Sequence, residues 1–189
     1  MTKSSKVSLR FATPDDTGLI LEFIQGLAEY EKLGHEVVAD EESLRRTLFG
    51  DRPAAEVVLA DLDGNPAGFA LFFHNFSTFL GRPGLYLEDL YVKPELRGHG
   101  IGKTLLSHLA AIAVERGCGR FEWSVLDWNE PAIRFYENLG AKAMNGWTIF
   151  RVTGDALSSL ADEDSRPGRG GSTGSRKPVP GASSPVLKD

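Results

Sequence analysis

The chain has 189 residues, of which 41% are hydrophobic, and it carries a formal net charge of −5. This length suits one domain with a real core, and its apolar runs fall far short of the roughly 20 residues that a transmembrane helix needs. The N-terminus has no apolar stretch typical of a signal peptide, Cys118 is the only cysteine, and no His/Cys cluster has metal-ligand spacing, so we expect a cytoplasmic protein without a metal.

Hydrophobic periodicity and turn residues predict ten elements. In chain order they are a strand over 7–12, a helix from 14 to about 31, a short helix that ends at 50, strands over 56–61, 67–76 and 85–92, a helix over 100–116, a strand over 120–126, a helix over 131–139 and a strand over 147–152. Thr13 and Pro14 are typical of a helix start, and Asp63-Gly64-Asn65 indicates a hairpin. The order β-α-α-β-β-β-α-β-α-β predicts an α/β (α+β) fold, a mixed central sheet with helices on both faces.

The end of the chain has a different composition. Among residues 165–189, 14 of 25 are Gly, Pro or Ser, and five basic residues stand against one acid. Such a segment buries too little apolar surface to offset its ordering entropy. We therefore expect a folded domain over residues 1–160 and a disordered basic tail over 161–189, with a nucleic-acid-binding or anchoring role of the tail as the alternative. The remaining 164 residues carry a net charge of −9, which favours cationic partners; we expect neither nucleic acid nor membrane as a partner.

Residues 85–103 combine acids with an anion-binding turn. The strand over 85–92 carries adjacent carboxylates at Glu88 and Asp89, and Pro94 ends it. A turn with three glycines over 97–102 then leads into a helix, where free backbone N–H groups at the positive end of the helix dipole bind phosphate oxygens. The spacing fits neither the Walker loop nor the dinucleotide fingerprint, because Arg97 stands where the Walker loop needs its first glycine. What remains is Arg-x-x-Gly-x-Gly.

A second segment, residues 123–141, supplies independent support: a strand leads into Asn129-Glu130-Pro131, and the next helix carries Phe135-Tyr136. Together the two segments resemble the GNAT superfamily of acetyl-coenzyme A-dependent N-acetyltransferases. Tyr86-Leu87-Glu88-Asp89, Trp128-Asn129-Glu130-Pro131 and Gly146-Trp147 are similar to the diamine (spermidine/spermine) N-acetyltransferase branch and its thialysine-acetylating relatives. The similarity covers about residues 7–160.

The resemblance implies roles for individual residues. Tyr136 would be the general acid that protonates the leaving thiolate, and Glu88 would draw a proton from the acceptor amine. The implied coenzyme-binding residues are Leu90, Tyr91, Val92, Arg97, Gly98, His99, Gly100, Ile101, Gly102, Lys103, Asn129, Glu130, Pro131, Ala132 and Tyr136. The implied substrate-binding residues are Tyr30, Glu31, Glu88, Asp89 and Asn145. The resemblance also implies splayed central strands and a homodimer.

Transfer of an acetyl group from a thioester to an amine requires the same residue types. An alkylammonium with a pKa of about 10.4 must lose a proton before it attacks, and a thiolate whose acid has a pKa of about 8.5 leaves better beside a proton donor. Asn145 stands where the polyamine branch carries an acid, so we expect a small cationic acceptor, a diamine or a lysine-like amino acid, rather than spermine. The alternatives are acetylation of a protein or peptide amine, and a non-catalytic coenzyme A-binding module. Each assignment has a structural alternative. Tyr136 would then only pack on its helix face, Glu88 or Asp89 would form a structural ion pair, and Tyr30 and Glu31 would be a solvated helix end.

Overall fold

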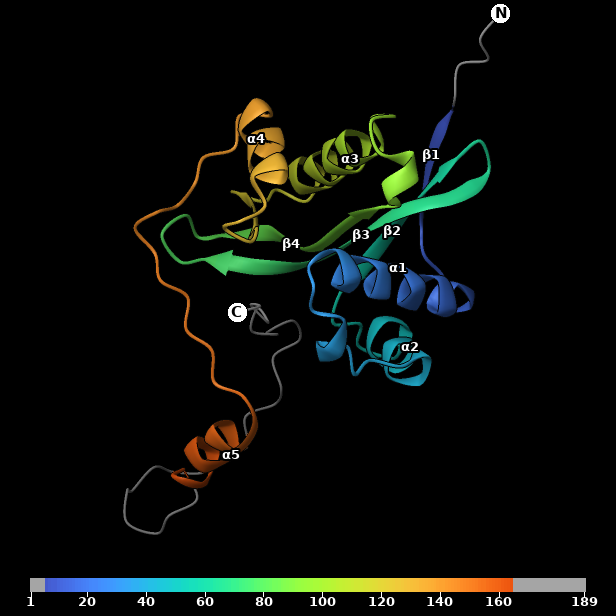
Figure 1. The fold of residues 1–189 in the computed structure, drawn as a ribbon. Helices are drawn as coiled ribbons and strands as arrows, with labels where there is room; N and C mark the ends of the chain where they lie inside the picture. The colour runs from blue at the N-terminus through green and yellow to red at the C-terminus, as the bar shows by residue number, and fades with distance from the viewer. Residues whose placement is uncertain (1–5, 165–189) are drawn as a thin grey trace, which may run out of the picture. The chain divides into compact units, whose positions relative to one another are not determined.

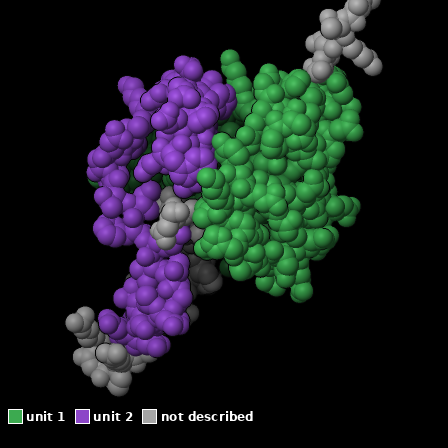
Figure 2. All heavy atoms as spheres, in the orientation of Figure 1, with its two compact units in different colours: residues 1–124, 181–183 green, residues 125–180, 184–189 purple. Residues whose placement is uncertain are grey.

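The computed structural model of the chain describes residues 6–164 (Figure 1). These residues form two compact units that divide between Ser124 and Val125 (Figure 2). Of the tail predicted over 161–189, residues 165–189 lie outside the described residues, whereas residues 161–164 comprise the end of helix α5 (Gly154–Asp162) and the turn after it. The helices among residues 6–164 are all too short or too polar to cross a membrane.

The first unit is built on a five-stranded sheet in the order β1-β2-β3-β4-β5. The strands are β1 (Val7–Phe11), β2 (Glu56–Leu62), β3 (Asn65–Ser77), β4 (Arg82–Val92) and β5 (Phe121–Trp123). Neighbours from β1 to β4 are antiparallel, whereas β5 runs parallel to β4. The predicted hairpin joins β2 to β3, and both Asp63 and Gly64 turn it with positive φ, 51° and 83°.

Helices cover both faces of this sheet, as predicted. The first unit holds α1 (Thr17–Tyr30), α2 (Glu41–Phe49) and α3 (Ile101–Glu115). In Figure 1, α1 and α2 lie on one face and α3 lies on the other. The second unit holds α4 (Glu130–Asn138) and α5 (Gly154–Asp162). The fold is therefore of the α/β class with a mixed central sheet.

Apolar side chains pack helix α1 against the C-terminal end of β4. Ile20, Phe23 and Leu27 recur at helical spacing and are buried on one side of α1. They pack against Phe69 of β3 and Tyr91 of β4, and the rings of Phe23 and Phe69 stack with centroids 5.6 Å apart. Because Tyr91 immediately precedes the last residue of β4, this core holds α1 next to the turn that follows.

Two predicted strands differ from the structure. The strand predicted over 120–126 is limited to β5, three residues long. The strand predicted over 147–152 is wrong, because this segment pairs with no strand among the described residues and leaves Trp147 and Phe150 73% and 90% exposed. An extended apolar segment becomes a strand only when the backbone of another strand pairs with it. The sequence of the segment does not specify whether such a strand is present. Helix α5 was not predicted, since its strong helix formers, Ala and Leu, are interspersed with Gly, Asp and Ser, which disfavour a helix interior.

Candidate active site

Glu88 lies in a β-bulge near the middle of β4. Leu71 of β3 pairs with Asp89, and the next residue, Phe72, pairs with Leu87, so the register of the ladder skips Glu88. A bulge of this kind bends the strand and re-aims side chains, and bulges are common next to active sites. The two adjacent carboxylates, Glu88 and Asp89, are both half-buried at this bend.

The pairing of β4 with β5 stops just before the bulge. The parallel ladder joins only residues 85–87 of β4 to Phe121–Trp123. Beyond it, Leu90, Tyr91 and Val92 keep their ladder to β3, while the described part of the chain offers no β5 residue on their other side. The ladder ends where β5 itself ends, at Trp123, so the splaying that the resemblance implies stays a prediction. The part of β4 beyond the ladder has a backbone edge that an extended ligand can bind in the manner of a strand.

The loop after β4 has the backbone of an anion site. Gly98 and Gly100 have φ values of 82° and 77°, in the left-handed region that only glycine adopts at little cost. Gly100 is the N-cap of α3 and has no side chain to bond the first-turn amides of the helix, so these amides remain available to an anion. His99 donates from Nδ1 to the carbonyl oxygens of Leu96 and Arg97, at 3.1 and 3.2 Å, which ties the loop together. Ile101, Gly102 and Lys103 form the first turn of α3.

Arg97 connects this loop to α1 and β4. Its Nε donates to the Val92 carbonyl oxygen at 3.2 Å, and its guanidinium carbon lies 4.3 Å from the ring centroid of Tyr30. The structure thus brings together a residue implied for the coenzyme and one implied for the acceptor. Glu31 follows directly as the C-cap of α1 and is half-buried.

The second unit carries the other residues implied for the coenzyme at the N-cap of α4 and within this helix. Asn129 is the N-cap of α4 and accepts a hydrogen bond from the Ala132 amide at 3.3 Å, with Pro131 in the first turn. Glu130 pairs with Arg134 one turn later, at 2.9 Å. Tyr136 lies in the same helix, and its ring contacts that of Phe135, with centroids 5.4 Å apart.

Asn145 lies outside any helix, in a turn beyond the end of α4.

Sequence reasoning missed one contact of β4 and one contact of the residue that follows it. The Tyr86 hydroxyl lies 2.8 Å from the Ser124 hydroxyl, just beyond β5, and burial raises the pKa of Tyr86, as do the charges of Glu88 and Glu122. Lys93, the residue after β4, pairs with Glu22 of α1 at 3.1 Å. Both pairs join residues more than 35 positions apart, for which one sequence offers no signal.

Comparisons with known proteins also indicate an acetyltransferase. A model described as the acetyltransferase (GNAT) family matches residues 24–141. A thialysine N-epsilon-acetyltransferase of Sus scrofa is 41% identical over 83% of this chain and 98% of its own length. An L-ornithine N5-acetyltransferase of Arabidopsis thaliana is 35% identical over 80% of this chain and 86% of its own length. Among solved structures, an integron cassette protein from V. cholerae superposes with a TM-score of 0.69 at 29% identity, over 82% of this chain and 97% of that one.

Proposed function

The chain belongs to the acetyltransferase (GNAT) family, and from this premise we propose that its acceptor is a small primary amine with a second positive charge, such as a diamine or a lysine-like amino acid. The reaction itself is the transfer of an acetyl group from acetyl-CoA to a small amine. The observation that carries the proposal is the pair of carboxylates, Glu88 and Asp89, at the β4 bulge.

The acceptors named for the relatives support a charged substrate. Thialysine and L-ornithine are amino acids that carry an amine on the side chain as well as the α-amino group. Carboxylates attract such cations, and the first unit holds three of them: Glu31 at the C-cap of α1, and Glu88 and Asp89 in β4. We include Tyr30 and Asn145 in the proposed acceptor site. Asn145 contributes no charge, which favours a short acceptor over a long polycation.

The features of the loop and of the β4 edge fit the coenzyme. Two glycines with positive φ and an uncapped helix start suit a pyrophosphate, and an unpaired strand edge suits the amides of a pantetheine arm. We propose that Arg97, Gly98, His99, Gly100, Ile101, Gly102 and Lys103 hold the pyrophosphate, that Leu90, Tyr91 and Val92 bind the arm through their backbone, and that Asn129, Glu130, Pro131 and Ala132 flank it. The bound coenzyme supplies an activated acetyl group.

Two residues then move the protons. Glu88 accepts a proton from the ammonium of the acceptor, whose pKa of about 10.4 leaves almost none of it nucleophilic at neutral pH. Tyr136 donates its phenolic proton to the departing sulfur. Positioned proton transfer of this kind contributes about 10²–10⁴ in rate. The placement of Glu88 in a bulge, where a side chain is aimed away from the regular ladder, supports its part.

We also propose that the protein is a cytoplasmic homodimer. Its single cysteine, Cys118, fits a reducing compartment. Apolar side chains over residues 147–152, including the exposed Trp147 and Phe150, support a partner surface, because soluble monomers seldom expose such patches. Sedimentation of the full chain tests the dimer: a single monomeric species at all concentrations contradicts it.

The decisive experiment is thiol release from acetyl-CoA with a panel of amines: putrescine, spermidine, spermine, thialysine, lysine, ornithine and a basic peptide. We expect turnover with the short diamines or the lysine-like amino acids, and weak turnover with spermine. Turnover with the peptide alone contradicts a small acceptor. Binding of coenzyme A without turnover of any amine indicates a non-catalytic module. A matched Glu88→Gln variant shows whether the turnover depends on the carboxylate.

A further inference from the structure

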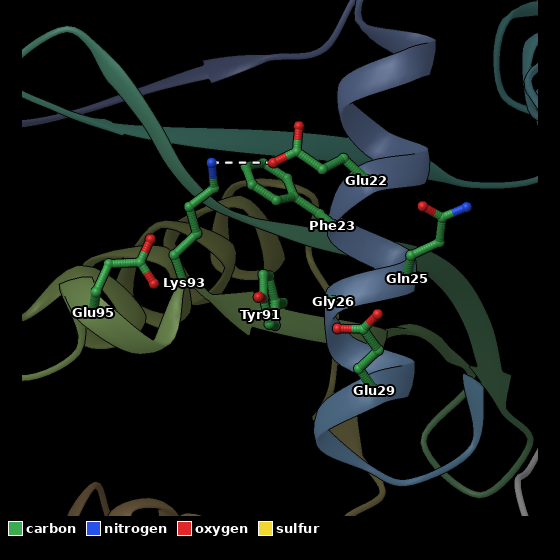
Figure 3. Close-up of a pocket in the computed structure, with 8 residues that line it drawn as sticks. All are labelled: Glu22, Phe23, Gln25, Gly26, Glu29, Tyr91, Lys93 and Glu95. Carbon is green, nitrogen blue, oxygen red and sulfur yellow. Dashed lines mark ion pairs between the residues drawn. The ribbon is translucent and has the colours of Figure 1, made fainter.

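A pocket of about 330 Å³ lies in the first unit between α1 and the end of β4. Figure 3 shows α1 on one side, with Glu22 and Glu29, and Lys93 with Glu95 on the other. The hydroxyl of Tyr91 lies between the two sides. None of the residues proposed to bind the acceptor lines this pocket.

The charge of the lining is negative. Three carboxylates, on Glu22, Glu29 and Glu95, are exposed at its rim, against the single ammonium of Lys93. Lys93 is already paired with Glu22, with Nζ 3.1 Å from Oε1. Two carboxylates are therefore not balanced by a cation of the lining. Phosphates of the coenzyme are repelled by such a surface, whereas an ammonium ion is attracted to it.

The Tyr91 side chain gives an independent indication of a ligand. It is only 8% exposed, and no hydrogen bond joins its hydroxyl to any of the described residues. A buried tyrosine side chain usually finds a hydrogen-bond partner for its hydroxyl, and this hydroxyl, which opens to the pocket, can bond there to a molecule from outside the chain. Burial raises the pKa of Tyr91, and so do the charges of Glu95 and Glu29, while Arg97 and Lys93 act in the opposite direction. At neutral pH the phenol therefore keeps its proton and has lone pairs that can accept.

Helix α1 is shaped to admit this hydroxyl. A Cβ on Gly26 would stand 2.5 Å from the Tyr91 oxygen, closer than two such atoms approach. Glycine inside a helix costs about 1 kcal/mol relative to alanine, so a glycine here is an unfavourable choice for the helix alone. Its presence leaves the space into which the hydroxyl reaches, beside the floor formed by Phe23.

We propose that this pocket is a second binding site, which takes a small free alkylammonium ion, held by Glu29 and Glu95 and by the Tyr91 hydroxyl. Its volume lies at the lower end of the range of about 300–1,000 Å³ for ligand sites, which suits a diamine and not a nucleotide. Lys93 precedes the short turn that leads to Arg97, and Glu95 lies within it, so the bound cation lies next to the proposed coenzyme loop. The proposal does not depend on acetyl transfer.

The test measures binding in the absence of acetyl-CoA. Putrescine is titrated into the ¹⁵N-labelled full chain, and the backbone amide signals of Gly26, Tyr91 and Glu95 are followed. We expect saturable shifts at these amides, and much smaller shifts with the neutral 1,4-butanediol. The double variant Glu29→Gln/Glu95→Gln should weaken putrescine binding by about 2- to 30-fold, the range that two exposed ion pairs span.

Two variants complete the test. Tyr91→Phe keeps the ring and removes the hydroxyl, and it should also weaken binding, while Glu42→Gln on an exposed position of α2 should not. The spectra themselves report whether each variant is folded. Absence of saturable shifts at Gly26 and Tyr91, or equal shifts with the diol, overturns the proposal. Shifts produced only by a lysine-containing peptide would replace the free amine by a protein side chain and overturn it as well. Loss of turnover in the amine panel leaves this result unaffected.

Discussion

Replacement of Tyr30 by alanine distinguishes two roles for this residue. The resemblance implied that Tyr30 contacts the acceptor, but in the structure the Arg97 guanidinium lies over its ring, 4.3 Å from the centroid. If the ring positions Arg97 for the pyrophosphate, its loss must weaken coenzyme binding. If it contacts the acceptor, its loss must weaken amine binding.

The expected magnitude follows from the exposure of the pair. A cation–π contact contributes about 0.5–1 kcal/mol at exposed sites, and Arg97 is exposed. Tyr30→Ala should therefore raise the Kd for coenzyme A by about two- to fivefold. Arg97→Ala removes the charged donor itself, and a charged hydrogen bond of about 1.5–3 kcal/mol corresponds to about 10- to 150-fold. Tyr30→Phe keeps an aromatic face under Arg97 and should retain most of the coenzyme affinity.

The assay separates the two ligands. Calorimetry gives the Kd for coenzyme A of each variant, and thiol release at saturating acetyl-CoA gives the KM for the amine. The same variants in the Arg97→Ala background provide the control, because Tyr30→Ala should then have little further effect on the coenzyme. An unchanged coenzyme Kd in Tyr30→Ala, with a raised KM for the amine, would refute the positioning role.

Three further results are expected. Tyr136→Phe should lower kcat by about 10²–10⁴ and keep the Kd for coenzyme A; an unchanged kcat at neutral pH would remove the proton-donor role. Gly26→Ala should lower the free energy of unfolding by about 1–3 kcal/mol, measured in urea, because the new methyl group meets the Tyr91 hydroxyl, and an increase in stability would show that the ring moves freely. Asp16→Asn should cost about 1–2 kcal/mol at pH 7, because Asp16 accepts two hydrogen bonds from Arg10 that hold the pKa of its carboxyl far below the ordinary value of 3.8. A lowered folded-state pKa gives stability that is fully present above pH 3.8 and is lost progressively as the pH falls toward the folded-state pKa, so the gap between wild type and variant should narrow steadily below about pH 4, and a gap that stays constant from about pH 5 down to about pH 2 would argue against the ion pair.

The local signals of the sequence were sufficient for most elements of the first unit. Period-2 and period-3.6 patterns, the Asp63-Gly64 turn and the Pro14 helix start predicted its sheet and helices, because each depends on residues close in the chain. The glycines of the loop were also informative, because Gly98 and Gly100 adopt the left-handed conformation that favours glycine. The splaying of β4 from β5 stays a prediction, which comes from the family resemblance and not from any local pattern.

The sequence pattern led to a wrong prediction for the strand over 147–152, because a strand needs a neighbouring strand to pair with. Residues 147–152 have the composition of a strand, yet a strand forms only when another backbone pairs with it, and the described residues provide none. The bulge at Glu88 was equally invisible, because it depends on how β3 aligns with β4 and not on either strand alone.

The sequence by itself thus determined the fold class, the family and the residue types of the chemistry, because backbone preferences and short motifs are encoded within a few positions. Only the tertiary structure decided which distant side chains meet. It placed Arg97 over Tyr30, paired Lys93 with Glu22, and set the Tyr91 hydroxyl against Gly26. Such contacts depend on how α1 packs across the sheet, and packing is fixed by the summed shapes of many buried side chains.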